Sequence, residues 1–161
     1  MPGTHSKWVR IVRGEVLGFA TFMTGELFAA ISTHTILSHA AAGSAGFDSA
    51  DPAFTNAVHA ALKEPELTAN RLFQVRARGL LFSMSPAEAE ATLSGTMIGL
   101  ELAGALKSAP KDTPVVLVVS GKLRSLYEAA FHRAGLQFST VDADDAVRHG
   151  LSQAARHIWS L

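Results

Sequence analysis

The residues near the start of the chain have the types and spacing needed to bind an anion. Pro2–Trp8 reads Pro-Gly-Thr-His-Ser-Lys-Trp, so a turn-forming pair precedes two hydroxyls, an imidazole, an amine and an indole. Backbone amides, hydroxyls and an ammonium group in one loop suit a polyphosphate, and an imidazole suits a phosphate or an acid. The alternative is a frayed terminus whose polar side chains bind nothing. The candidate phosphate-binding residues are Gly3, Thr4, His5, Ser6 and Lys7.

Three further polar residues are candidates for a ligand cleft. Thr24 and Glu26 follow an expected strand and open an expected helix. Thr24 suits an N-cap and Glu26 suits the positive end of the helix dipole, so capping alone is one interpretation and a cleft-facing role is the other. Arg76 belongs either to a solvated basic helix face or to a contact with an anionic ligand or partner domain.

Two glycines, Gly95 and Gly99, share one face of a long predicted helix. Each costs about 1 kcal/mol relative to alanine inside a helix, so something must approach that face closely. Either a packed strand or helix, or the base or ribose of a nucleotide, would explain them. Ser120 and Gly121 follow an apolar strand, at the strand end where α/β proteins bind ligands. Ser-Gly-Lys at this point lacks the spacing of a Walker A motif.

Composition excludes several functions. The 161 residues fit one domain and carry no formal net charge, which argues against a nucleic-acid binder. There is no Cys and the seven His are scattered, so no metal site is expected. No apolar run reaches the roughly 18–20 residues that span a membrane, and a signal peptide is absent. The expected location is the cytoplasm.

The elements that must position these residues form an α/β pattern. The sequence predicts a hairpin, a block of helices and a βαβα unit, with a mixed sheet that is antiparallel at its start and parallel at its end. Gly18 marks either a bulge or a close approach of another backbone, and the strand over 114–119 is expected to be covered on both faces. The predicted strands are 7–12, 16–23, 114–119 and 136–141, and the predicted helices are 25–38, 52–63, 66–81, 85–106, 123–134 and 143–159.

Pro2–Trp8 resembles a signature of the 2-dehydro-3-deoxygalactonokinases, sugar-acid kinases of the actin/hexokinase/Hsp70-like superfamily. Further segments resemble the family in the expected order, and together they cover nearly the whole chain. These segments are Thr24–Leu27, Leu72–Ala77, Leu93–Gly95 with Ile98, Gly99 and Glu101, and Val118–Gly121 with Tyr127.

The resemblance implies an RNase H-like (actin-like ATPase) domain and ATP-dependent phosphorylation of the terminal 6-hydroxyl of 2-dehydro-3-deoxy-D-galactonate, with Mg²⁺. It implies that Gly3–Lys7 is the second phosphate-binding loop and that Thr24 and Glu26 face the interdomain cleft. It also implies that Ser120 and Gly121 lie near adenosine, with the helix of Gly95 and Gly99 beside them. The expected partners are the sugar acid and ATP.

Three features of the family pattern are missing. No D-x-G-x-T loop and no M-R-G-E-E segment occur, and the strand that should lead into Pro2 is absent. Residues 1–161 are therefore expected to be the C-terminal, nucleotide-side domain without its first strand. The catalytic residues are expected in the missing N-terminal domain, and the isolated chain is expected to have little or no activity.

Two alternatives remain at this point. The chain is a non-catalytic module that binds a nucleotide or a protein, or it is one subunit of a kinase whose first domain is a separate chain. An apolar face left uncovered by the missing domain would favour homo-oligomers.

Overall fold

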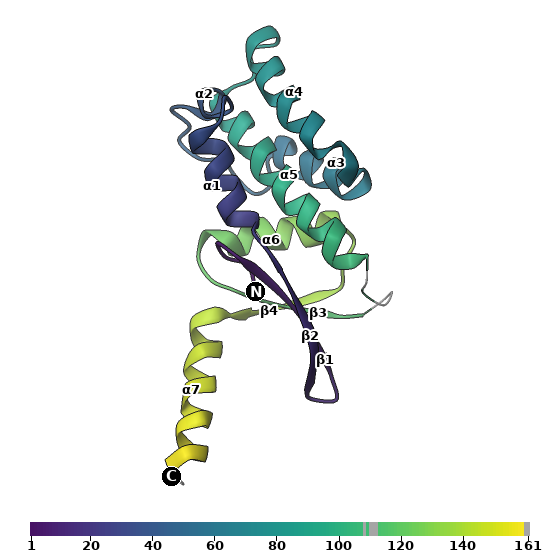
Figure 1. Ribbon diagram of the computed structural model, residues 1–161. Helices are drawn as coiled ribbons and strands as arrows, with labels where there is room; N and C mark the ends of the chain where they lie inside the picture. The colour runs from purple at the N-terminus through teal and green to yellow at the C-terminus, as the bar shows by residue number, and fades with distance from the viewer. Residues whose placement is uncertain (108, 110–112, 160–161) are drawn as a thin grey trace.

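The chain folds into two pairs of strands and a layer of helices (Figure 1). The computed structural model describes all residues except 108, 110–112 and 160–161. Residues 108–113 are polar in sequence and are predicted to form a loop, part of which lies outside the described residues. The elements are β1 Ser6–Val12, β2 Glu15–Phe22, α1 Thr24–His34, α2 Ser38–Ala41, α3 Pro52–Lys63, the 3₁₀ turn η1 Pro65–Leu67, α4 Thr68–Leu81, α5 Pro86–Leu106, β3 Val115–Val119, α6 Lys122–Arg133, β4 Phe138–Asp142 and α7 Ala143–Trp159.

The predicted hairpin is confirmed. β1 and β2 pair antiparallel, and Arg13 and Gly14 connect them with φ angles of 52° and 81°, the left-handed turn that suits a two-residue hairpin loop. The register shifts between Arg10 and Ile11, so Leu17 is the extra residue. The bulge therefore lies beside Gly18, and it is one of the two outcomes expected there.

The predicted βαβα unit is also confirmed. β3 and β4 pair parallel, with α6 between them in the chain and α7 after them. The sequence predicted one mixed sheet, but the structure differs. Among the described residues β1 bonds only to β2 and β3 only to β4, so the strands form two separate pairs. Residue patterns identify strands, but they do not fix which strand edges meet. The α/β class itself is confirmed.

The coverage expected for β3 is wrong. Leu117 and Val119 are buried, whereas Val116 is 57% exposed. Successive side chains of a strand point to opposite faces, and here only one face of β3 meets the helices.

Helix α5 lies at the centre of the helical layer and packs along α3. The main core joins these two helices to α6 and β3, through residues such as Phe54, Leu102, Leu117 and Phe131. A smaller core cluster joins α2, α4 and the first half of α5. In Figure 1, α4 lies at the end of the molecule away from the hairpin, and α7 projects at the same end as the hairpin. Within the described residues, no helix combines the length and the apolar character needed to cross a membrane.

Two helix boundaries differ from the prediction. The helix expected over 25–38 stops at His34, where the Thr35 hydroxyl donates to the Ile31 carbonyl oxygen, and α2 follows as a separate turn. Such a side-chain bond competes with the backbone ladder. The helix expected from 66 begins at Thr68, after η1.

Candidate functional site

A buried carboxylate, Glu101 in the middle of α5, organises the site. The side chain is 2% exposed and accepts hydrogen bonds from four side chains. Oε1 accepts from the Ser6 hydroxyl at 2.6 Å and from Trp8 Nε1 at 2.8 Å. Oε2 accepts from the Tyr127 hydroxyl at 2.7 Å and from the Thr24 hydroxyl. Residues far apart in the sequence therefore meet at one group.

These four donors compensate the burial of the carboxylate. A buried charge is costly unless it is paired or hydrogen-bonded, and a carboxylate offers about four acceptor sites. No Lys, Arg or His of the described residues forms a salt bridge with Glu101. Burial, and then the nearby charge of Glu101, raise the pKa of Tyr127 far above its usual 10.0, so the phenol stays a donor.

Residues 1–7, here called the opening loop, form a closed turn that lies on the start of α1. Lys7 N–H donates to the Met1 carbonyl oxygen at 3.0 Å, which closes the loop at its base. Glu26 N–H donates to the Thr4 carbonyl oxygen at 3.0 Å. A Cβ atom on Gly25 would lie 2.7 Å from the Gly3 carbonyl oxygen, so only glycine permits this approach. The loop is therefore fixed to the junction of β2 and α1, and it is not a frayed end.

The outer side of the loop carries exposed polar groups. His5 and Lys7 are exposed, and the His5 imidazole pairs with the Glu26 carboxylate across the loop. Lys7 Nζ donates to the His5 carbonyl oxygen at 3.1 Å. Among the described residues, the backbone N–H groups of Gly3, Thr4 and His5 have no acceptor. Free amides beside an imidazole and an ammonium group can bind an anion.

Ser6 and Thr24 lie in a different place from the one predicted. They are 1% and 7% exposed, and both hydroxyls are used by Glu101. The Ser6 hydroxyl therefore donates to Glu101, and Thr24 does the same while it also lines a pocket beside the loop. Thr24 is not the N-cap of α1 either, because Met23 holds that position without a side-chain bond. Of the predicted cleft residues beside the loop, Glu26 alone is exposed.

The glycines of α5 contact α3. A Cβ atom on Gly95 would lie 2.4 Å from the Phe54 carbonyl oxygen, and one on Gly99 would lie 2.5 Å from that of Val58. The packed-helix interpretation therefore explains both glycines. Their face is filled by α3 and has no room for a base or ribose.

The remaining candidates lie at the end of β3 and on α4. The Ser120 hydroxyl donates to Asp142 Oδ2 at 3.2 Å and accepts from Ala143 N–H, so it joins the ends of β3 and β4. Gly121 is exposed with φ 66°, and nothing lies within 4 Å of a Cβ built there, which leaves it open to a ligand. Arg76 lies on α4, which packs against α2, η1 and α5 rather than against the loop.

A small apolar pocket of about 130 Å³ opens beside the loop. It is well below the roughly 300–1,000 Å³ of most ligand sites, so it fits one ring rather than a whole nucleotide. Its walls come from the opening loop, α1, α5, α6 and the loop before α3. The lining residues are Gly3, Thr24, Gly25, Phe28, Phe47, Glu90, Ser94, Met97, Ile98, Leu123, Leu126 and Tyr127.

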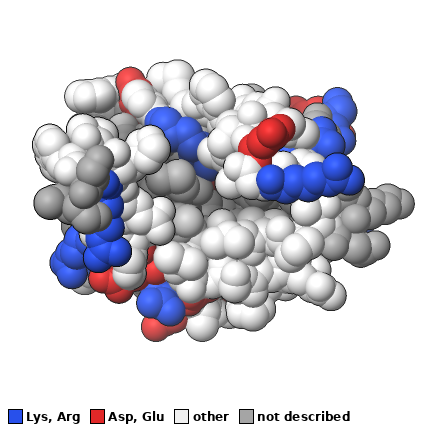
Figure 2. Space-filling view, turned by 90° about the horizontal axis from the view of Figure 1, so that it is seen from below, with Lys and Arg blue, Asp and Glu red and all other residues white. Residues whose placement is uncertain are grey.

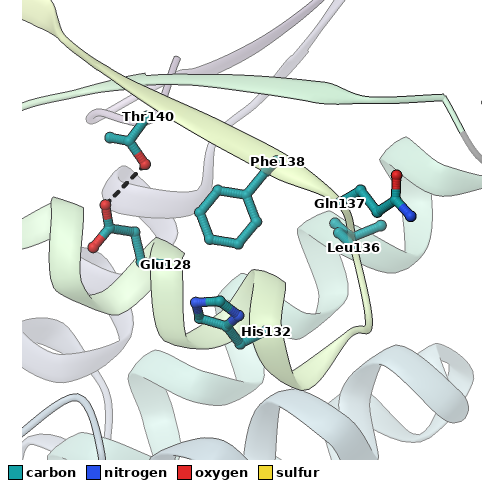
Figure 3. Close-up of a pocket in the computed structure, with 6 residues that line it drawn as sticks. All are labelled: Glu128, His132, Leu136, Gln137, Phe138 and Thr140. Carbon is teal, nitrogen blue, oxygen red and sulfur yellow. Dashed lines mark hydrogen bonds between the residues drawn. The ribbon is translucent and has the colours of Figure 1, made fainter.

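A wider, open groove of about 600 Å³ lies between α6 and β4 (Figure 3). Thr140 donates to Glu128 at 2.8 Å, and the His132 ring packs edge-on against Phe138. The Thr140 bond is the main cause that lowers the pKa of Glu128. None of the predicted site residues lines this groove, so we do not assign the site to it.

The candidate site residues chosen from the sequence did not include Glu101, Trp8 or Tyr127, which form the buried hydrogen-bond cluster. One signal was available: Glu101 is the only charged residue between Thr92 and Leu106 of α5. A lone acid in an apolar helix implies a buried, hydrogen-bonded group. Its partners could not be found, because the Ser6 contact spans 95 residues.

Comparisons with known proteins agree on one family. Residues 1–154 match the model of the family described as 2-keto-3-deoxy-galactonokinase. The chain is 55% identical over its full length to a Rhizobium meliloti (strain 1021) protein named a probable 2-dehydro-3-deoxygalactonokinase, and covers 53% of it. It is 30% identical over 98% of its length to the Escherichia coli (strain K12) 2-dehydro-3-deoxygalactonokinase, again covering 53%.

A solved structure is equally similar. The crystal structure of a Sinorhizobium meliloti protein, assigned as a 2-dehydro-3-deoxygalactonokinase, superposes with a TM-score of 0.94 at 56% identity. The match covers 99% of this chain and 52% of that one. The chain thus spans about half the length of the relatives it matches.

Proposed function

This chain belongs to the 2-keto-3-deoxy-galactonokinase family, and on that premise we propose that it is the C-terminal, nucleotide-side part of a sugar-acid kinase. The proposed reaction transfers the terminal phosphoryl group of ATP to the 6-hydroxyl of 2-dehydro-3-deoxy-D-galactonate in the cytoplasm. The chain alone has little or no turnover, because the chemistry needs residues that it does not contain.

The opening loop carries this proposal. Its free amides, with the exposed His5 and Lys7, form a donor set that suits phosphate oxygens. Phosphoryl transfer depends mainly on positioning and on stabilisation of charge, which is the contribution that such a loop makes. In the proposal, Lys7 supplies charge to a phosphate and His5 exchanges its Glu26 partner for a phosphate oxygen.

The base and ribose are assigned to the surface beside the loop. The apolar pocket is lined by Phe28, Phe47 and Leu123, which suit an aromatic ring. Gly121, at the carboxyl end of β3, leaves its backbone open to a ligand.

The kinase reaction implies Mg²⁺, but the described residues do not form a site for it. Within the part of the chain that the structure describes, no group of three His, Asp or Glu side chains lies close enough together to hold a metal ion. Mg²⁺ is commonly bound by one or two carboxylates together with substrate phosphates. We therefore assign no residue of this chain to the metal and derive no step through it.

An uncovered apolar surface supports the idea of a partner domain. Figure 2 views the molecule from the end where the hairpin and α7 project, and uncharged residues form most of that face. The exposed apolar side chains include Val9, Ile11 and Phe19 of the hairpin and Val147, Leu151 and Ile158 of α7. Patches of this kind mark interaction sites. The partner is the rest of the longer kinase, a separate N-terminal chain or a second copy.

Two measurements test the proposal. Titration calorimetry with ATP and with ADP should detect binding, and a coupled ADP-release assay with the sugar acid and MgATP should detect no turnover above background. Lys7→Ala should weaken binding, whereas Lys63→Ala at the end of α3 should not. Adding the N-terminal half of a longer relative should restore turnover if the chain is one part of a split site.

Two results would contradict the proposal. Turnover at an ordinary kinase rate by the chain alone would exclude an incomplete site. Absence of nucleotide binding would favour the second candidate, a non-catalytic module that binds a protein through the apolar faces of the hairpin and α7.

A further inference from the structure

The donors to Glu101 come from β1, which follows the opening loop, from α1, on which the loop lies, and from α6. Ser6 and Trp8 are two residues apart on β1, so their side chains point to the same face of the strand and Lys7 points to the other. Because Ser6 and Trp8 both donate to Oε1, Lys7 must face outward. Thr24 donates to Oε2 and directly precedes Gly25, which is the residue that the loop contacts.

We infer that Glu101 is the positioning residue of the opening loop: through its hydrogen bonds it holds β1 and α1 on α5, so that His5 and Lys7 face outward. This inference rests on the proposed role of that loop in binding phosphate. Glu101 touches no reacting atom. It acts through Ser6, Trp8 and Thr24.

Both oxygens of Glu101 are needed as acceptors, because each receives two donors. Trp8 Nε1 can only donate, so Oε1 must remain an acceptor. In Glu101→Gln the amide nitrogen must therefore take the place of Oε2, where the Thr24 and Tyr127 hydroxyls now donate. Both hydroxyls would lose their acceptor. This substitution should keep the β1 contacts and weaken those of α1 and α6.

The change in anion affinity caused by Glu101→Gln has opposite signs for a positioning role and for a purely electrostatic one. Removing a negative charge from beneath an anion site strengthens anion binding if Glu101 acts only through its field. If Glu101 positions the loop, the same substitution weakens anion binding, because the donors no longer converge.

The first arm measures the loop itself, by NMR-detected hydrogen exchange on the full chain. The reporters are the Lys7 amide, bonded to Met1, and the Glu26 amide, bonded to Thr4. Glu101→Ala should speed exchange at both by roughly tenfold or more, which corresponds to about 1.4 kcal/mol. Glu101→Gln should speed hydrogen exchange at the Glu26 amide more than at the Lys7 amide. Thr24→Val and Tyr127→Phe, which each remove one donor, should give smaller changes at Glu26 and test the network if Glu101→Ala does not fold.

The control is Leu102→Ala, which opens the core at the adjacent, fully buried residue and leaves the carboxylate in place. It should speed exchange within α5 but not selectively at the two reporters. If Glu101 and Leu102 variants change the reporters equally, Glu101 is merely structural and the inference fails.

The second arm uses inorganic tripolyphosphate as the probe, in titration calorimetry. Glu101→Gln should raise the dissociation constant by about tenfold, and Leu102→Ala should leave it unchanged. Tighter binding by Glu101→Gln would overturn the inference. If the wild-type chain binds no tripolyphosphate, the proposed role of the loop fails, and the exchange experiment still decides whether Glu101 positions it.

Discussion

Gly95 and Phe54 lie so close that a Cβ atom on the glycine would be 2.4 Å from the Phe54 carbonyl oxygen. The neighbouring pair of Gly99 and Val58 repeats this contact one turn later, at 2.5 Å. Helices α3 and α5 therefore pack with their backbones in contact. This explains why α5 accepts glycine in its interior.

Gly95→Ala should destabilise the fold although alanine favours a helix. Glycine costs about 1 kcal/mol in a helix, but the new methyl group meets a backbone atom that cannot turn away. We expect a net loss of about 1–3 kcal/mol in the free energy of unfolding, measured by urea denaturation.

Gly79→Ala is the matched control for that substitution. Gly79 lies in α4 and nothing is within 4 Å of a Cβ built there. Alanine should stabilise the chain by about 0.5–1 kcal/mol. If both substitutions stabilise the chain, the close packing of α3 on α5 is contradicted.

Gly25→Ala should move the opening loop without damaging the core. The added Cβ atom would lie 2.7 Å from the Gly3 carbonyl oxygen and 2.9 Å from Thr4 Cα. The loop must then leave α1, and the Glu26 amide should lose its protection from hydrogen exchange. Nucleotide binding should weaken, while the far-ultraviolet circular dichroism stays unchanged. Unaltered exchange at Glu26 would show that the loop is not fixed there.

Tyr127 is the only tyrosine, so its ionisation can be followed by phenolate absorbance. Burial and the Glu101 charge raise its pKa, and therefore the folded chain should show no phenolate signal as the pH passes 10.0. A raised pKa adds stability that is fully present below the unfolded value and is lost as the pH rises above it. Unfolding and phenolate formation should coincide.

Glu101→Gln should shift that titration towards lower pH without bringing it to the ordinary value, because burial remains the larger cause. A phenolate signal near pH 10.0 in the folded wild-type chain would mean that Tyr127 is not buried against a carboxylate.

The stability that Asp142 contributes should be lost as the pH falls, whereas the contribution of Tyr127 is lost as the pH rises. The Asp145 backbone N–H, and also the Asp144 N–H and the Ser120 hydroxyl, lower the pKa of this carboxyl below 3.8. A lowered pKa adds stability above the unfolded value, and that stability is lost as the pH falls through the folded value. The start of α7 should therefore loosen only below pH 3.8.

NMR titration of the Asp142 carboxyl tests this. Ser120→Ala should raise the pKa of Asp142, whereas Ser139→Ala, at an exposed position on β4, should leave it unchanged. Equal titration curves for the wild-type chain and the Ser120 variant would remove Ser120 from the cap.

Local signals in the sequence predicted the local structure well. Ser85–Glu88 has the spacing of a capping box, Asp51 precedes Pro52, and Gly135 follows a predicted helix. The structure forms both caps, and Gly135 is left-handed. Each depends on a few neighbouring residues, so the pattern alone is sufficient. The Gly95 and Gly99 spacing also predicted a close approach, although only the structure identifies α3 as the neighbour.

Contacts between distant segments could not be predicted. Thr24 suited an N-cap by its type, but the buried Glu101 is a stronger acceptor, and it draws the hydroxyl away from the helix end. Ser6 suited a phosphate for the same chemical reason and is bonded to the same carboxylate. One buried carboxylate thus binds both hydroxyls.

The exposed apolar side chains of the hairpin and α7 also affect how the chain behaves in solution. Phe19 is 74% exposed and Leu151 is 67% exposed, on a chain with no formal net charge at pH 7. Colloidal repulsion is weakest where net charge vanishes, so self-association should be greatest near neutral pH. A buffer whose pH gives the chain a net charge should therefore keep it dispersed at higher concentration than a neutral buffer does.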